Sequence, residues 1–508
     1  MDLVAVIRAH GVRRGEQDFY NFLFPSTPRC ALLRLTLLPS CVVRFTMAES
    51  AMPEHSNIRL RFTTREADLV LSDTVPILIP TNFRRYQLSQ YVNSQLEFSK
   101  PVPLEFLING TYLRGTLDDY LNENGISGET VLSVEYVRAR IPPQYVASYE
   151  HDDWVSSVDA SSSIDAPPRI VTSSYDGRVR VWNTSTQLLA TSTSGVDGGH
   201  HSYVKSAKFV SPHEVVSAGF DRTIKLWEYT DSSIESSGEL KARLELYGHK
   251  AGVESVCAHH ASKRLLSASS DHSVGFWSTK KSDAPPAPLN LIPKSVTREG
   301  KRRKLNPSIS VAQRGPLRLM HGHTAPVFAA DFDVRDETVG YSASLDHTVK
   351  TWDLESGETV DTRSTNSALF CLEQMSSLGL IAAGSANRDI KMIDPRASAV
   401  SVVAMTLKGH KNHVVTLARD PDHDYVLASG SHDGTCRIWD LRSTRSSKDG
   451  TTGSSVFTIP RQSLENKAAP VTGEGVKVFG LCWHPRIGIL SAGEDKVLQV
   501  NSSMEHVT

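Results

Sequence analysis

The sequence lacks the cysteine pairs and the long apolar runs that mark secreted, zinc-binding or membrane proteins. Its six cysteines lie far apart, without a CxxC or CxxxC pair. This spacing argues against a disulfide framework and against a zinc site, and it fits a reducing intracellular compartment. The best apolar stretch, residues 30–43, is interrupted by Arg34 and Pro39, and it is shorter than the roughly 18 residues that a membrane-spanning helix needs. We therefore expect a soluble protein with no membrane partner.

A net charge of either sign and the common catalytic motifs are also missing. The 55 Lys and Arg residues offset 56 Asp and Glu residues, so no global field exists to attract nucleic acid or lipid. Any basic partner site must be local. The chain contains no GxxxxGK[ST] phosphate loop and no HExxH sequence, so an ATPase or a metalloprotease has no sequence support. We predict a protein that is not an enzyme and has no cofactor, no intrinsic metal and no small-molecule substrate.

The sequence does contain an internal repeat. The pattern Asp-x-x-(apolar)-x-x-Trp occurs five times, and two weaker copies complete a series of seven units. The clear copies are Asp176–Trp182, Asp221–Trp227, Asp271–Trp277, Asp346–Trp352 and Asp433–Trp439, and the weaker copies are Asn387–Ile393 and Asp495–Asn501. A recurring unit of this kind predicts a repeat architecture.

A histidine precedes several of these aspartates at a nearly constant distance. His249, His323 and His410 stand 22, 23 and 23 residues before their aspartates, and His200 or His201 serves the second unit. Short alternating apolar runs follow, and a second apolar run ends in Ser-x-Ser or Ser-Ala-Gly. Such runs, separated by turns that contain Asp, predict antiparallel strands joined by hairpins.

These features resemble the WD-repeat family over about residues 145–501. The resemblance implies a mainly β fold, a seven-bladed WD-repeat β-propeller over residues 144–508, in which each unit forms a four-stranded blade. It also implies that the His, the turn Asp, the Trp and a Ser or Thr on the second strand form a buried polar network within a blade. The last unit stops near Val500, so we expect residues 145–149 to supply the outer strand of the seventh blade and remove an open edge.

Three insertions interrupt the repeats, at residues 231–241, 280–318 and 443–473. The first is rich in Ser and Glu, the second is Pro-rich and basic, and the third is rich in Ser, Thr and Gly. Compositions of this kind cannot bury a core, so we expect exposed, mobile loops.

The second insertion has a basic centre. It holds ten Lys or Arg residues against two acids. The densest run is Lys301, Arg302, Arg303 and Lys304. This run is a candidate nuclear-localisation signal or a contact to RNA phosphates, and a merely solvated loop is the plain alternative. No aromatic residues are interleaved with these charges, which weakens the case for stacking on RNA bases.

Residues 57–143 form a separate unit in front of the repeats. The predicted elements are strands at 58–62 and 75–79, a helix at 84–96, strands at 104–108 and 112–114, a short helix at 116–122 and a strand at 131–137. This order resembles ubiquitin, so we expect a small α+β ubiquitin-like domain of the β-grasp type. The unit ends in Ile141-Pro142-Pro143 rather than Gly-Gly, which excludes a conjugated modifier and favours a docking module.

Residues 1–56 are predicted to form a disordered N-terminal extension. The first 46 residues contain six Arg and no Lys, which faintly resembles a mitochondrial transit peptide, but the apolar part comes late and no cleavage site is obvious. An over-extended gene model is a further alternative, because Met47 stands eleven residues before the first predicted strand.

The two domains together resemble one family. The segments that carry the resemblance are 101–108 (PVPLEFLI), 118–121 (DDYL), 134–136 (VEY), 141–143 (IPP), 153–157 (DWVSS), 267–271 (SASSD) and 339–342 (VGYS). They are similar to the Notchless-like (NLE) domain and the propeller of the Ytm-type nucleolar WD-repeat ribosome biogenesis proteins, the WD-repeat subunit of the Pescadillo, Bop and WD-repeat (PeBoW) complex. Seven units favour this family over the Notchless proteins, whose propellers have eight blades.

The resemblance implies a role rather than a reaction. It implies a non-enzymatic scaffold for large (60S) ribosomal subunit assembly and rRNA maturation, located in the nucleus, nucleolus and nucleoplasm. The implied partners are Bop-type (Erb) and Pescadillo-type (Nop) proteins in a heterotrimer, the 66S/60S pre-ribosomal particle, and the AAA ATPase midasin, which releases the factor from that particle.

One acidic residue stands out within the implied docking module. In the family, the ubiquitin-like domain supplies one carboxylate to the Mg²⁺ of an adhesion site on midasin, and the matching residue here is Glu129. A hard divalent ion accepts such a ligand reversibly. A solvated turn acid is the plain alternative. Asp118 and Asp119 are expected to be helix-starting acids instead.

Two other classes of function have weaker sequence support. Ser431, His410 and Asp433 can be nominated as a nucleophilic triad, but the same trio recurs in several units, which favours a packing device. A propeller alone would also suit a substrate receptor or adaptor of a ubiquitin ligase or of a chromatin complex. Neither an F-box nor an adaptor-binding helix is evident, and only the scaffold hypothesis accounts for both domains.

Overall fold

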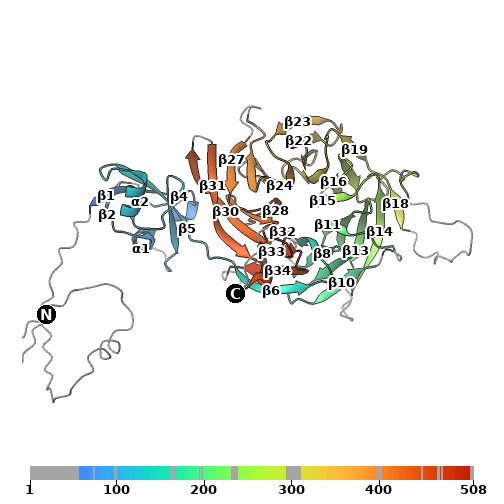
Figure 1. The fold of residues 1–508 in the computed structure, drawn as a ribbon, viewed down its shortest axis with the longest axis horizontal. Coiled ribbons are helices and arrows are strands. Elements are labelled where there is room, and N and C mark those ends of the chain that lie inside the picture. Colours follow the sequence, from blue (N-terminus) through green and yellow to red (C-terminus); the bar gives the residue numbers. More distant parts are fainter. Residues whose placement is uncertain are drawn as a thin grey trace, which may run out of the picture.

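The computed structural model describes most of residues 56–503. The gaps within this range are 72–74, 97–99, 162–166, 194, 196–197, 230–237, 293–310, 398–402, 448–449, 466–469 and 471–472. The described chain forms a small α+β domain and a larger ring of β-sheets beside it (Figure 1). No helix in the described part of the chain is long and apolar enough to cross a membrane.

The N-terminal domain is a five-stranded sheet with two α-helices. Its elements are β1 (Asn57–Thr63), η1 (Ala67–Leu69), β2 (Ile77–Pro80), α1 (Arg85–Leu96), β3 (Leu104–Ile108), β4 (Thr111–Tyr112), α2 (Leu117–Asn124) and β5 (Val131–Arg138). The strand order is β2-β1-β5-β3-β4, and β1 runs parallel to β5 in the middle of the sheet. Each segment expected from the sequence is present, with ends shifted by at most two residues.

Apolar side chains and one capping box explain these local structures. Helix α1 buries Leu88 and Val92 in the core that it shares with Phe106 of β3. Thr116 and Asp119 cap α2 reciprocally, each side chain accepting the other's backbone N–H. The expectation that Asp119 starts a helix is therefore confirmed, and this pairing contributes about 1 kcal/mol to such a helix.

Antiparallel pairing groups the described strands after residue 143, apart from the short strand at 312–314, into seven sets of four, which we call units. Parallel pairing of residues 190–192 with 238–240 and of 406–407 with 452–453 joins two pairs of neighbouring units, so the sheets contain nine, four, four, eight and four strands. The first three units are β7 (Val155–Ala160), β8 (Ile170–Ser174), β9 (Val179–Trp182) and β10 (Leu188–Ser192); β11 (Val204–Ser211), β12 (Glu214–Gly219), β13 (Thr223–Tyr229) and β14 (Gly238–Tyr247); and β15 (Val253–His259), β16 (Arg264–Ser269), β17 (Ser273–Ser278) and β19 (Arg318–His321). The next two are β20 (Val327–Phe332), β21 (Val339–Ser344), β22 (Thr348–Asp353) and β23 (Thr359–Ser364); and β24 (Leu369–Met375), β25 (Leu380–Ser385), β26 (Asp389–Ile393) and β27 (Val403–Lys408). The last two are β28 (Val414–Arg419), β29 (Val426–Ser431), β30 (Thr435–Ser447) and β31 (Gly450–Pro460); and β32 (Val478–His484), β33 (Gly488–Gly493), β34 (Val497–Ser502) and β6 (Gln144–Glu150). This is the bladed architecture of a WD-repeat propeller, as expected.

The hydrophobic core of the propeller lies between neighbouring units rather than inside one of them. The cluster that contains Leu244 and Leu265 joins the second unit to the third, and the cluster that contains Val500 and Val155 joins the seventh to the first. The other boundaries are filled in the same way. A unit therefore buries its apolar faces only when both neighbours are present.

The ring closes with a strand from the start of the propeller segment. β6 pairs antiparallel with β34, with Tyr149 opposite Leu498 and Glu150 opposite Val497. The expected outer strand of the seventh unit is therefore confirmed. Residues more than 340 positions apart in the sequence complete one sheet, which removes an unpaired edge.

The expectation of three unstructured insertions was wrong in part. Within 231–241, residues 238–241 belong to β14, and within 280–318, β18 (Ala312–Arg314) pairs in parallel with β14. Most of 443–473 extends the β30–β31 hairpin, where Thr444 pairs with Gly453. Ser-, Thr- and Gly-rich composition predicted loops, but backbone hydrogen bonds to an existing edge stabilise these strands without a core of their own.

Candidate functional site

Four units contain the same buried hydrogen-bonding network. In the sixth unit, His410 Nδ1 lies 2.9 Å from Asp433 Oδ2, and His410 Nε2 lies 2.7 Å from Ser429 Oγ. Trp439 Nε1 donates to the same oxygen of Ser429 at 2.8 Å. The equivalent sets are His200, Ser217, Asp221 and Trp227; His249, Ser267, Asp271 and Trp277; and His323, Ser342, Asp346 and Trp352. The structure thus brings the predicted residues together, and His200 rather than His201 serves the second unit.

The electrostatics of this network favour a neutral histidine beside a charged aspartate. Burial lowers the pKa of His410 and of His323. Burial would raise the pKa of Asp433, but hydrogen bonds from His410 and Thr435 outweigh it and hold that pKa well below its ordinary value. A neutral imidazole then donates from Nδ1 to the carboxylate and accepts the hydroxyl proton of the serine at Nε2.

The serine that meets His410 is Ser429, so the triad nominated with Ser431 is wrong. Ser431 instead donates to the backbone oxygen of Asn412 at 3.1 Å. Ser429 is fully buried, and its oxygen is already bonded to His410 and Trp439. The same enclosed arrangement recurs in four units, which identifies it as a device that fixes the strands of a blade.

The first unit carries an altered network. His151 Nε2 lies 2.9 Å from Thr172 Oγ1, which also accepts from Trp182 Nε1 at 2.9 Å. Asp176 forms an ion pair with Arg180 at 2.5 Å. The spacing rule missed His151, because it stands 25 residues before Asp176 rather than 22 or 23.

The seventh unit uses an arginine in place of the histidine. Arg461 is 1% exposed, and it donates to both carboxylate oxygens of Asp495 at 2.6 and 3.0 Å. Its remaining nitrogen donates to Ser491 Oγ at 2.8 Å. In this weaker copy, a bidentate arginine holds the turn that a histidine holds elsewhere.

The fifth unit replaces the network with a short ion pair. Asp389 accepts hydrogen bonds from Ser385 Oγ and from Lys391 Nζ, the latter at 2.8 Å. The polar residue that matters is therefore Asp389, two positions after the Asn387 that the repeat pattern singled out.

Glu129 lies in the exposed turn between α2 and β5. Ser127 organises this turn, because its hydroxyl accepts from the Glu129 N–H at 3.4 Å and its carbonyl accepts from the Thr130 N–H at 3.2 Å. Gly128 has no heavy atom within 4 Å of the position where a Cβ would stand. Among the described residues, no side chain pairs with the Glu129 carboxylate, so the turn presents a solvated acid.

Strand β5 separates Glu129 from one of the contacts between the domains. Glu129 precedes the first residue of β5, whereas the chain beyond the last residue leads to Arg140, whose Nη1 donates to Asp420 of the propeller at 2.7 Å. A strand rises about 3.3 Å per residue, so the eight residues of β5 place these two features roughly 25 Å apart. Glu129 is exposed with both domains in place, so its carboxylate is accessible.

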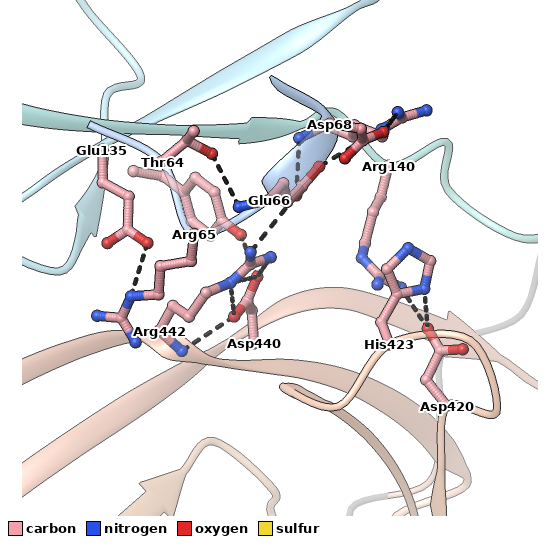
Figure 2. A network of polar contacts seen from close by, with 12 residues as sticks. Thr64, Arg65, Glu66, Asp68, Glu135, Arg140, Asp420, His423, Asp440 and Arg442 are labelled. Atoms are coloured by element: carbon pink, nitrogen blue, oxygen red, sulfur yellow. Dashed lines mark hydrogen bonds and ion pairs between the residues drawn. The ribbon is translucent and has the colours of Figure 1, made fainter. Parts of the chain in front are cut away.

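A polar network joins the two domains, as Figure 2 shows. Tyr112 OH donates to Asp440 Oδ2 at 2.8 Å, and Arg442 Nη2 lies 2.8 Å from the same oxygen. Arg442 also approaches Glu66 Oε1 of the N-terminal domain at 3.6 Å. Burial raises the pKa of Tyr112, while Arg442 holds the pKa of Asp440 below its ordinary value despite burial. The Tyr112 phenol and the Asp440 carboxylate therefore form a charge-assisted hydrogen bond that water does not reach easily.

A second group of contacts strengthens the same junction. Arg140 and His423 both contact Asp420, at 2.7 and 3.1 Å (Figure 2). The guanidinium groups of Arg65 and Arg442 lie 5.7 and 5.5 Å from the centre of the Tyr425 ring. Contacts of this kind come from residues with no periodic signature, and the sequence interpretation missed them.

Aromatic rings form a continuous arc on the propeller face where the innermost strands begin. Tyr175 stacks on Tyr203 with ring centres 4.9 Å apart, and Tyr203 stacks on Phe220 at 4.6 Å. The aromatic arc, defined by its successive ring contacts, consists of Phe220, Tyr203, Tyr175, Trp154, Phe479, His432, His413, Phe370 and Phe328. Trp154 and Phe220 are 38% and 43% exposed. Burial lowers the pKa of His432 to about 4, so its ring is uncharged near neutral pH.

The arc borders the mouth of a central cavity. This cavity has a volume of about 570 Å³, and residues from the first strand of every unit line it. A signal for the arc was present in the sequence, because an aromatic residue directly precedes the turn aspartate in three units, at Tyr175, Phe220 and His432. Recurrence at one repeat position places such rings on one face of the ring.

Two further predictions concern the basic run and the absence of an intrinsic metal. Lys301, Arg302, Arg303 and Lys304 lie outside the described residues. In the described part of the chain, no group of three or more His, Cys, Asp or Glu side chains could hold a metal ion.

Comparison with known proteins links both domains to one group of relatives. Residues 58–121 match the NLE (NUC135) domain family, and residues 143–183, 190–228, 240–278, 314–353 and 401–440 match the WD domain, G-beta repeat family. The chain is 56% identical over 461 residues to the ribosome biogenesis protein ytm1 of Aspergillus clavatus, covering 87% of this chain and 94% of the relative. It is 54% identical over 474 residues to the ribosome biogenesis protein ytm1 of Neosartorya fischeri, covering 90% and 97%.

A solved structure supports the fold alone. The WD40 β-propeller domain of Doa1 superposes with a TM-score of 0.50 at 19% identity, covering 71% of this chain and 96% of that domain. The first three strands of the fifth unit and of the seventh unit, whose networks are altered, fall outside the matched repeats. They nevertheless form four-stranded antiparallel units like the others.

Proposed function

The chain belongs to the ytm1 family of ribosome biogenesis proteins, and we propose that it is a non-enzymatic scaffold for assembly of the large ribosomal subunit and maturation of its rRNA. The observation that carries this proposal is the high identity across both domains rather than across the propeller alone. A WD propeller by itself supports many functions, whereas the pairing of the two domains restricts them.

The docking function is assigned to the N-terminal domain. We propose that the Glu129 carboxylate completes the coordination of a Mg²⁺ held by the adhesion site of midasin, which then extracts the protein from the 66S/60S pre-ribosomal particle. The support is geometric: the acid is exposed on a turn without a side-chain partner among the described residues, and it lies at the opposite end of β5 from the chain that leads to the Arg140 contact. A single carboxylate presented in this way suits a hard cation that its partner supplies.

The scaffold function is assigned to the propeller. We propose that the aromatic arc binds the Bop-type partner of a heterotrimer with a Pescadillo-type protein. Exposed aromatic side chains grouped on one face are typical of protein interfaces, and Trp and Tyr are the residues that most often dominate binding energy there. The nucleus, nucleolus and nucleoplasm are the corresponding locations, with residues 301–304 proposed as the import signal.

Partner binding through the arc can be tested by one pair of substitutions. Trp154→Ser should weaken co-purification with the Bop-type partner by about 2 kcal/mol or more, because an interface aromatic is lost. Val360→Ser is the control, since Val360 is 66% exposed on β23, away from the arc. Equal binding by both variants would assign the interface elsewhere.

The docking function is tested with the full chain and an isolated midasin adhesion-site domain in Mg²⁺. We expect Glu129→Gln to lower the affinity at least about tenfold, because the amide is a weak ligand for Mg²⁺, and EDTA to abolish binding. Glu123→Gln is the matched control, because Glu123 is an exposed acid on the neighbouring helix α2. Binding that is indifferent to Glu129 and to EDTA would remove the metal-ligand assignment.

A further inference from the structure

A second cleft lies at the domain junction, beside the network of Figure 2. It has a volume of about 480 Å³, and its walls come from residues 110–112 and 114 around the β3–β4 hairpin, from Lys408 at the end of β27, and from residues 443, 445 and 452–456 of the β30–β31 hairpin. We name it the junction groove. Neither domain can form it alone.

The groove is lined by cations and hydroxyl groups, and no acid contributes to its walls. The cations are Arg114, Lys408 and Arg445, and the hydroxyl groups include those of Thr111, Thr452 and Ser455. Lys408 and Arg445 have no carboxylate partner among the described residues. Arg114 shares Glu105 with Arg85, at 3.5 and 2.9 Å, so this corner of the groove also carries a net positive charge.

A fourth cation stands directly behind the lining. Arg437 Nη1 donates to Ser455 Oγ at 3.1 Å. Its buried Nε has no hydrogen-bond partner within the described part of the chain. An arginine that is left partly unsatisfied and paired with no carboxylate adds to the potential of the groove and polarises the Ser455 hydroxyl toward an incoming anion.

This chemistry selects a ligand with several anionic oxygens. Arginine, lysine and hydroxyl donors whose positive charges outnumber the neighbouring carboxylates suit phosphate oxygens. The volume exceeds that of a single phosphate, and the Arg114 guanidinium lies 5.1 Å from the centre of the Tyr112 ring, which adds a flat surface for stacking. A sugar–phosphate chain with a base at one end matches this combination.

We propose that the junction groove binds the sugar–phosphate backbone of single-stranded RNA. The choice of RNA among phosphate-bearing ligands rests on the proposed function, because a pre-ribosomal particle supplies such strands. Since Arg114 belongs to one domain and Lys408 and Arg445 belong to the other, RNA binding and domain docking favour each other.

The test measures fluorescence anisotropy of a short labelled oligouridine with the full chain at several salt concentrations. The groove variant Lys408→Glu with Arg445→Glu should bind about tenfold more weakly, and the slope of log K against log[salt] should fall by about one for each phosphate that the protein no longer neutralises. Both side chains are exposed, so the variant should keep its fold, which circular dichroism and a melting curve check.

Two further experiments distinguish RNA binding in the junction groove from binding elsewhere on the protein and from binding of single anions. Lys301→Glu with Lys304→Glu makes the same charge change in the basic insertion and should weaken binding far less than the groove variant does. Equal losses in the two variants, or a larger loss in the insertion variant, would overturn the proposal. Inorganic phosphate, compared with chloride at equal ionic strength, should not displace the RNA; full displacement would identify a site for lone anions and overturn it as well.

Discussion

Tyr112 and Asp440, 328 positions apart in the sequence, form a hydrogen bond of 2.8 Å that crosses the junction between the two domains. The acceptor is a carboxylate already held by Arg442, so the phenol completes a site that is largely organised before the domains meet. The orientation of the N-terminal domain, and with it the direction in which Glu129 points, depends on this small set of polar contacts.

Removal of the Tyr112 hydroxyl should loosen the junction without unfolding either domain. We expect Tyr112→Phe to weaken docking by about 2 kcal/mol, the value of a hydrogen bond to a charged partner. Amide hydrogen exchange in β4 and in residues 139–143 should accelerate. Tyr145→Phe is the control, because Tyr145 is 41% exposed and its hydroxyl contacts Ser148 at 3.1 Å. Unchanged exchange in the Tyr112 variant would show that the domains do not depend on this contact.

Loss of one network histidine should destabilise the whole propeller. His410→Ala leaves Ser429 and Asp433 buried without their shared partner, and we expect the free energy of unfolding to fall by about 3 kcal/mol. Urea denaturation measures the change. His201→Ala serves as the comparison, because that ring is exposed and should alter stability by no more than about 0.5 kcal/mol. Similar values for the two variants would contradict a structural role for the network.

Acid should destabilise the first unit through His151. Burial lowers the pKa of His151 from 6.5 to about 4, with a further contribution from Arg180. The unfolded chain therefore binds more protons, so the stabilisation is fully present above about pH 6.5 and is lost as the pH falls toward about 4.

Substitution of His151 should make the free energy of unfolding depend less steeply on pH in the acid range. In that window His151→Gln should reduce the slope of unfolding free energy against pH by up to one proton, or about 1.4 kcal/mol per pH unit. Urea titrations between about pH 7 and about pH 4 provide the slopes, and His201→Gln provides the control. Identical slopes for wild type and His151→Gln would rule out a titrating role for this ring.

Ring closure should depend on Tyr149. This side chain is 2% exposed, contacts Trp182 at a ring distance of 5.5 Å, and donates to the Asn183 carbonyl at 3.1 Å. Tyr149→Ala should cost about 3 to 5 kcal/mol, because it empties the core between the seventh unit and the first. A melting temperature within error of the Tyr145→Phe control would show that the ring closes without this packing.

The features of the fold and of the site that could be predicted are mainly those whose residue pattern recurs along the sequence. His249, His323 and His410 were found because their spacing to an aspartate recurs, and ubiquitin-like order in the first domain followed from alternating apolar segments. Arg461 was missed because a different side chain solves the same structural problem in the seventh unit. A pattern search detects residue types, whereas the hydrogen bonds of a turn can be satisfied by more than one type.

Contacts between distant parts of the chain could not be predicted in this way. Nothing near Tyr112 in the sequence indicates that its hydroxyl faces Asp440, and composition around Thr444 favoured a loop where the structure has a long hairpin. Edge strands of this kind draw their stability from backbone pairing with a neighbour, which leaves little trace in side-chain hydrophobicity.

The pairing of β6 with β34 also has a consequence for how the protein is made. Glu150 and Val497 are partners although 347 positions separate them, and at about 5 to 20 residues per second the translating ribosome needs roughly 20 to 70 s to travel from one to the other. For most of that interval β6 is outside the ribosome without a partner strand, next to an N-terminal domain that can already fold. The nascent chain therefore spends most of its synthesis with an unpaired strand that is a target for chaperones and a hazard for aggregation.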